Sequence, residues 1–250
     1  MTATGWAWLA AAGIFALVDW IAVAQGARQT ERIAKPLVLL AIIGAALAAH
    51  PIKPGVQGWL IAALSLGLIG DIALVAERRP ARVPVGATGG RHQATAAATP
   101  GKAPRLAVEP AGGRTQLLFL AGLLAFLLGH LGYARAMQVY GTDRLSVAFG
   151  LTLVLIALLS FGYRIMAGAH ALGGGRLTVA VVLYVVALGS AVVLGVGTEQ
   201  LWIAAGIVLF AISDLVLAYD RFVQARSHAP VTVAISYHLA QALLLLGLVS

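Results

Sequence analysis

Long apolar runs separated by short polar segments set the pattern of this chain of 250 residues. A helix needs roughly 20 mostly apolar residues to cross the hydrocarbon of a bilayer. The runs are continuously apolar rather than alternating, which predicts helices and not the strands of a barrel. The second run is the shortest, since it is uninterrupted only over residues 36–49. Eight segments fit a membrane helix, and they lie near residues 6–25, 34–52, 57–76, 116–137, 145–167, 177–195, 201–218 and 231–249.

The amino-acid composition supports the prediction of a membrane protein. Hydrophobic residues make up 60% of the chain, and only 17 Lys and Arg and 9 Asp and Glu carry charge. A soluble domain has about a quarter of its residues charged, so a single packed core in water is excluded. With no cysteine in the chain, disulfides and thiolate sites are excluded as well. We predict one all-α polytopic membrane domain, residues 1–250, whose first span is retained because it lacks the basic start of a signal peptide.

The basic residues predict an orientation. Fourteen of the 17 follow the first, third, fifth and seventh predicted spans, and only Lys53, Arg135 and Arg144 lie on the opposite side. Because basic loops stay in the cytoplasm, we expect both termini outside it, in a bacterial cytoplasmic membrane. The formal net charge of +8 is then a consequence of topology, and we expect no nucleic-acid partner.

One polar segment, residues 77–115, differs in composition from the rest of the chain. It is rich in Pro, Gly, Ala and Arg and has few residues to bury, which predicts a mobile cytoplasmic loop between the third and fourth spans. Its basic residues would attract anionic lipid headgroups. The alternative is an insertion that loops tolerate without any specific role.

Three acidic residues, Asp19, Asp71 and Asp214, lie within predicted spans. An ionisable residue inside a span costs at least ~2.5 kcal/mol on insertion scales, so each marks a candidate site. The first, third and seventh spans run in the same direction, and each Asp lies in the cytoplasmic third of its span. The three carboxyls are therefore expected at similar depth, which is compatible with one shared cavity.

Asp71 and Asp214 also share a local pattern. Each follows a small residue and precedes two apolar residues and a Leu, with an acid-Arg pair six and seven residues further on. The two copies are 143 residues apart on spans of equal direction, which predicts a four-plus-four parallel repeat. Because residues seven apart share a helix face, Arg221 would lie below Asp214; the alternative is a boundary Arg that reaches to the headgroups.

Other polar residues in or near the spans are candidates for binding or orienting a substrate. Lys35 could bind a phosphate or pair with an Asp, although anchoring at the membrane edge explains it equally well. A tyrosine in a span can orient a carboxyl or simply pack, and a membrane histidine is often a packing residue that makes a hydrogen bond. The remaining candidates are His130, Tyr133, Tyr184, Ser213, Tyr237 and Gln241.

Several chemistries lack their motifs. The six histidines are too dispersed to propose a zinc site, and no Gly-x-Ser-x-Gly or P-loop sequence occurs. Serine hydrolysis and nucleotide-driven work therefore have no support, and we expect neither a metal nor another cofactor.

Five sequence blocks, in this order, resemble the YhhN/TMEM86 family of integral membrane proteins. They are Lys35-Pro36, Gly67 to Leu74, Gly122 to Tyr133, Leu209 to Phe222 and Tyr237 to Gln241. Together they cover most of the chain, and the departure is segment 77–115, where family members usually have a shorter link. Characterised members are lysoplasmalogenases with eight spans. The resemblance implies a lysophospholipid substrate within membrane lipids, and hydrolysis of its vinyl ether bond to a fatty aldehyde and a glycerophosphoethanolamine or glycerophosphocholine.

The implied reaction agrees with the acidic residues. A vinyl ether is cleaved by protonation at carbon and attack of water on the resulting oxocarbenium ion, which needs one protonated acid and one ionised carboxylate. Two carboxyls close together in a dry cavity do not both ionise freely, and glycosidases use paired carboxyls against a related cation. We expect Asp71 and Asp214 to divide these roles, with Lys35 attracting the lipid phosphate.

Two other function classes remain open at this stage. Acids near the membrane midplane and an internal repeat are also found in proton-coupled transporters of small or lipid-like substrates. A non-catalytic membrane protein would use its Asp residues only to hold helices together. The headgroup of the substrate, the acid and base assignment and the oligomeric state are not determined by the sequence.

Overall fold

The chain folds as a bundle of helices. The computed structural model describes residues 1–50, 53–77 and 113–249, and these contain no strand, which confirms the all-α class. The elements are α1 (Ala3–Gln25), α2 (Arg28–Leu47), α3 (Val56–Glu77), α4 (Gly113–Tyr140), α5 (Arg144–Ala157), the π-helix η1 (Leu158–Gly162), α6 (Tyr163–Gly197), α7 (Leu201–Phe222) and α8 (Ala229–Val249).

The expected eight spans are confirmed only in part. The described residues form seven helical stretches, of which six are long and apolar enough to cross a membrane. α2 is not among the six, because its first turns carry charged residues before the short apolar run begins. α5, η1 and α6 are one stretch, 144–197. The four-plus-four repeat is not confirmed.

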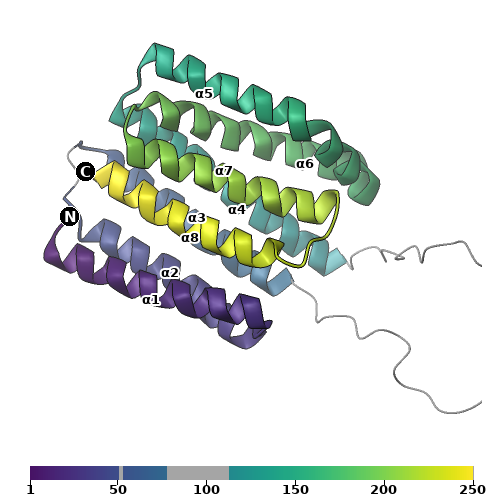
Figure 1. Ribbon diagram of the computed structural model, residues 1–250, viewed down its shortest axis with the longest axis horizontal. Helices are drawn as coiled ribbons and strands as arrows, with labels where there is room; N and C mark the ends of the chain where they lie inside the picture. Colours follow the sequence, from purple (N-terminus) through teal and green to yellow (C-terminus); the bar gives the residue numbers. More distant parts are fainter. Residues whose placement is uncertain (51–52, 78–112, 250) are drawn as a thin grey trace, which may run out of the picture.

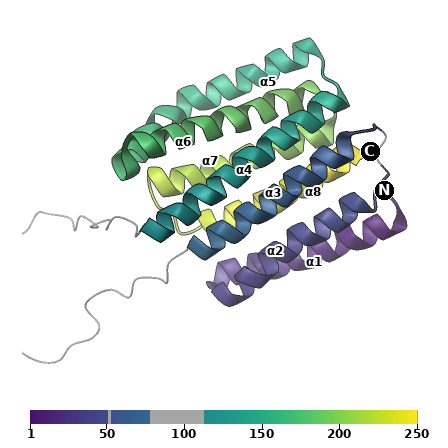
Figure 2. The same ribbon diagram turned by 180° about the vertical axis from the view of Figure 1, so that it is seen from behind.

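The long stretch 144–197 is interrupted at two glycines within α6. Gly173 and Gly174 leave the helical region, and Gly174 has a φ of 61° and a ψ of −158°. Side chains rarely allow this conformation, whereas glycine adopts it freely. The chain reverses there, so that α5 and the second part of α6 lie side by side (Figures 1 and 2).

Helices that follow one another in the chain pack as neighbours, except α4 and α5, and the bundle has two distinct ends. Both termini lie at one end, and the ends of α3 and α4 that flank segment 78–112 lie at the other (Figures 1 and 2). The expected mobile loop, residues 77–115, falls largely on residues 78–112, which lie outside the described part of the chain. The expectation of loop mobility therefore remains a prediction.

The core consists of apolar side chains where α2, α3, α7 and α8 meet, with Leu39, Leu64, Ile207 and Leu244 fully enclosed. Large apolar side chains also cover the outer surface of the bundle, as expected for helices that face lipid. Small residues allow close approach: a Cβ on Gly132 would lie 3.2 Å from the Cβ of Ala63. Such contacts drive helix association in membranes, where water does not.

Polar residues are also enclosed within the bundle, and most of them are those selected from the sequence. The buried polar side chains of the described residues include Asp19, Glu31, Lys35, Asp71, His130, Ser213, Ser236, His238 and Gln241. Each such group is costly in an apolar interior unless another polar group compensates it, so their arrangement identifies the candidate site.

Candidate active site

A cavity of about 370 Å³ lies inside the bundle, and both Asp71 of α3 and Asp214 of α7 line it. Most of the remaining lining is apolar and comes from α4 to α7, including Phe126 and Leu188. The structure therefore brings together two of the three membrane acids that the sequence selected.

Polar and aromatic groups of α4, α6 and α7 surround Asp214. The Tyr184 hydroxyl donates a hydrogen bond of 2.5 Å to its Oδ2 atom. The His130 Nε2 atom lies 3.6 Å from the same oxygen, which is too long for a hydrogen bond. The His130 ring meets the rings of Tyr184 and Phe210 edge to face. α4, α6 and α7 thus fix the position of one carboxyl.

Asp71 has a cation beside it. The Lys35 Nζ atom of α2 lies 3.3 Å from its Oδ1, and the exposed fractions of the two side chains are 7% and 1%. The same ammonium lies 5.6 Å from the centre of the Tyr237 ring, which also lines the cavity. Lys35 is therefore engaged with a carboxylate inside the protein, and it lines the cavity beside it.

Tyr133 and Gln241 lie behind the cavity wall rather than on it. Tyr133 is 1% exposed and Gln241 is fully buried, and the Tyr133 hydroxyl donates to the Gln241 Oε1 atom. Gly67 leaves space for the Tyr237 hydroxyl, because a Cβ at position 67 would lie 3.3 Å from that oxygen. These residues support Tyr237 from behind.

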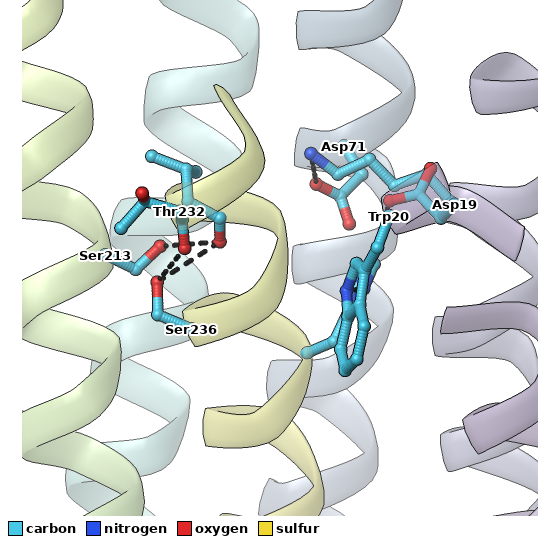
Figure 3. A network of polar contacts seen from close by, with 9 residues as sticks. Asp19, Trp20, Asp71, Ser213, Thr232 and Ser236 are labelled. Atoms are coloured by element: carbon cyan, nitrogen blue, oxygen red, sulfur yellow. Dashed lines mark hydrogen bonds and ion pairs between the residues drawn. The ribbon is translucent and has the colours of Figure 1, made fainter. Parts of the chain in front are cut away.

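Asp19 does not line the cavity. Its Oδ2 atom lies 3.9 Å from Nδ1 of His238, which already accepts a hydrogen bond of 3.1 Å from Trp20 Nε1. Nδ1 is therefore the unprotonated nitrogen of this ring, and its contact with Asp19 is not a bond between charges. Figure 3 shows Asp19 and Trp20 on the same side of α8 as Asp71.

Ser213 lines the cavity, but its hydroxyl is used between helices. It donates to the Val233 carbonyl at 3.2 Å, and Ser236 donates to the Thr232 carbonyl at 2.7 Å. Figure 3 shows these bonds on the side of α8 that faces away from Asp71. The Ser213 bond ties α7 to the first turns of α8, the Ser236 bond lies within α8, and neither orients a carboxyl.

Arg221 pairs across the bundle. Its Nη2 atom lies 3.0 Å from Oε1 of Glu77, at the end of α3, and its guanidinium stacks 3.6 Å from the centre of the Phe119 ring. Arg221 also lines the cavity. Arg221 belongs to the copy of the shared pattern around Asp214, and Glu77 belongs to the copy around Asp71. Their ion pair therefore joins the ends of α3 and α7. Arg78 lies outside the described residues.

The profile of the YhhN family matches residues 108–248, more than half of the chain. This protein belongs to the YhhN family. The match includes His130, Tyr184 and Asp214, whereas Lys35 and Asp71 precede it. Comparisons with curated proteins and with solved structures found no significant match.

Sequence reasoning missed Trp20, and with it the bond from Trp20 to His238 in the polar interior of this YhhN protein. His238 was visible as a polar residue beside Tyr237, and Trp20 directly follows Asp19. Their hydrogen bond joins α1 to α8, which are far apart in the chain, and no pattern in either helix pairs them. Within the described ranges, no three His, Asp or Glu residues gather in a way that could hold a metal ion.

Proposed function

We propose that the protein is a lysoplasmalogenase-type hydrolase that cleaves the vinyl ether bond of a lysoplasmalogen to a fatty aldehyde and a glycerophosphoethanolamine or glycerophosphocholine. Membership of the YhhN family supports this class of activity. The observation that carries the proposal is a pair of carboxyls with different partners in one largely apolar cavity. Asp71 has the Lys35 ammonium beside it, and Asp214 has the neutral Tyr184 hydroxyl.

This difference assigns the two roles. A cation beside Asp71 favours its ionised form, so Asp71 is the base that accepts a proton from water. Asp214 is the acid, with Tyr184 bonded to one oxygen and the other oxygen left to carry the proton. The Tyr184 bond and the nearby His130 ring hold the carboxyl in position. Paired groups with opposed surroundings are how acid and base chemistry is divided in enzymes.

In the first step Asp214 gives its proton to the vinyl carbon that bears no oxygen, and the double-bond electrons form the new C–H bond. The positive charge is shared between the other vinyl carbon and the ether oxygen. The oxygen of a water molecule bonds to the vinyl carbon that bears the ether oxygen, and Asp71 takes a proton from this water. The product is a hemiacetal, with Asp71 protonated and Asp214 ionised.

In the second step the roles reverse. Asp214 accepts the proton of the hemiacetal hydroxyl, and the bond between that carbon and the glycerol oxygen breaks. Asp71 returns its proton to the departing oxygen, which gives the free glycerophosphoethanolamine or glycerophosphocholine. The aldehyde is released, and both carboxyls regain their starting states, so that one water is consumed in each cycle.

We further propose that the end of the bundle holding both termini lies outside the cytoplasm of a bacterial cell. This orientation rests on the fourteen basic residues assigned to the opposite side. Arg221, in the last turn of α7, lines the cavity, so the substrate headgroup would face the cytoplasmic leaflet.

The test is aldehyde release by the purified protein in detergent, from a lysoplasmalogen beside its saturated ether analogue. We expect release from the vinyl ether alone, and its loss in Asp71→Asn and in Asp214→Asn. Asp143→Asn is the matched control, because Asp143 is an exposed cap residue of α5 and Asn caps a helix nearly as well. Near-normal activity in both cavity variants would end the proposal.

The same assay separates hydrolysis from transport. An enzyme releases aldehyde without a closed compartment, whereas a proton-coupled carrier has no activity in detergent. A folded wild-type protein that releases no aldehyde, but moves a lipid across a vesicle membrane under a proton gradient, would establish the transporter instead.

A further inference from the structure

The cavity extends beyond the two carboxyls toward α5, which is held less tightly than the rest of the bundle. Among the described helices, α5 packs against α6 and not against α4 or α7. It has a single buried residue, Gly150, and η1 has none. Figure 1 shows α5 at the outer edge of the bundle. Within the described part of the chain, neither α5 nor η1 packs against α7.

Apolar and exposed side chains form the rim of an opening between η1 and α7. Leu158 and Phe161 of η1 are 39% and 37% exposed, and Ile212 of α7 is 46% exposed, and all three line the cavity. Ile212 lies midway along α7, so in a membrane crossed by α7 the opening faces the hydrocarbon. At that depth only a hydrocarbon chain can enter from the side, because headgroups remain at the interface.

From the carboxyls, an apolar arm of the cavity continues toward the end of the bundle that holds the termini. Val154 of α5, Leu188 and Val192 of α6 and Val208 of α7 line it. Along α7, Val208 lies six residues before Asp214, a rise of ~9 Å at about 1.5 Å per residue. Cavities for small ligands typically measure about 300–1,000 Å³, so about 370 Å³ for the whole space favours one hydrocarbon chain over two.

We propose that the hydrocarbon chain of a single-chain lipid enters sideways between η1 and α7 and lies in this arm, which then selects substrates by chain length. The identity of the lipid rests on the proposed function. The arm places the far end of the chain away from Arg221 and the bond nearest the headgroup beside Asp214. The π-helix contributes to the opening, since such irregular turns recur at functional sites.

Ala157 provides the test, because it lines the cavity and its side chain is exposed. A larger residue there takes up cavity space without disturbing a buried contact. Ala148 on the same helix is also exposed and does not line the cavity, so Ala148→Phe is the matched control for Ala157→Phe. The probes are saturated alkyl-ether lysophospholipids of increasing chain length, which cannot be hydrolysed at a vinyl ether.

The measurement is displacement of a fluorescent lysophospholipid from the protein in nanodiscs. We expect Ala157→Phe to weaken binding of the longest chains about tenfold, the effect of excluding two methylenes, and to leave short chains unchanged. Ala148→Phe should follow the wild-type series. An unchanged series in Ala157→Phe, or the same shift in Ala148→Phe, would overturn the inference.

Aldehyde release from lysoplasmalogens of the same chain lengths distinguishes the two proposals. Turnover by the wild type together with an unchanged binding series refutes the arm and keeps the hydrolase. A shifted binding series without turnover by the wild type refutes the hydrolase and keeps a chain-selecting lipid site.

Discussion

Replacing Lys35 by Met tests the ion pair that distinguishes Asp71 from Asp214. The substitution keeps the length and the apolar stem of the side chain and removes only the ammonium. Lys35 and Asp71 are 7% and 1% exposed at the side chain, so solvent cannot replace the lost charge. Adding Asp71→Asn removes the second charge, and the four proteins form a double-mutant cycle.

The magnitude follows from the geometry. At 3.3 Å and an effective dielectric constant of about 20, the attraction is about 5 kcal/mol, and enclosing each ion costs several kcal/mol. The intact pair therefore contributes little net stability. In Lys35→Met the Asp71 carboxylate is still buried at its full desolvation cost, but its attraction to the ammonium is lost. We therefore expect the substitution to lower the free energy of unfolding by about 3–5 kcal/mol. The double variant should recover about 1–3 kcal/mol of this loss.

The assay is equilibrium unfolding in mixed detergent micelles, followed by circular dichroism for all four proteins. Arg176→Met is the control for loss of a cation, because Arg176 is exposed and surface changes are usually within about 0.5 kcal/mol. The reasoning is refuted if Lys35→Met costs no more than this control, or if the two substitutions are additive within about 0.5 kcal/mol.

Two further predictions concern single hydrogen-bonded groups. Tyr184→Phe removes the bond to Asp214, which becomes ionised as it gives up its proton. A bond to a charged group contributes about 1.5–3 kcal/mol, so kcat should fall by about 10- to 100-fold; an unchanged kcat contradicts a positioning role. The hydrogen bond from the Ser146 backbone N–H lowers the pKa of Asp143, helped by that of Leu145. Its stabilisation is present above the ordinary Asp pKa and is lost as pH falls through the lowered value. The Tm of the wild type should therefore fall at acid pH, and Asp143→Asn should reduce this fall. An unaltered profile of Tm against pH would contradict the role of the Asp143 carboxylate as the cap of α5.

The helix positions and the two cavity acids could be predicted from the sequence, for separate physical reasons. Apolar runs of sufficient length form helices wherever lipid forbids unpaired backbone groups, so the main spans follow from composition. Asp71 and Asp214 are conspicuous because charge is scarce inside spans. The predicted spans that correspond to α3 and α7 cross the membrane in the same direction. This was enough to predict that the two carboxyls lie at similar depth.

The partners of these acids could not be predicted in the same way. Most helices here are apolar on every side, so the sequence does not indicate which face turns inward. Helix rotation decides that Arg221 meets Glu77 and that Trp20 meets His238. The expected position of Arg221 below Asp214 considered one helix alone, whereas the observed bond joins two helices.

The polar start of α2 links the incomplete span prediction to the candidate chemistry. The charged residues that exclude α2 from the strongly apolar helices include Lys35, in its second turn. An ammonium at this depth costs free energy by itself, and Asp71 at 3.3 Å offsets that cost. A fully apolar α2 would cross lipid more readily and would leave Asp71 without this cation. The feature that weakens α2 as a membrane span is therefore the feature that makes the two cavity carboxyls chemically different.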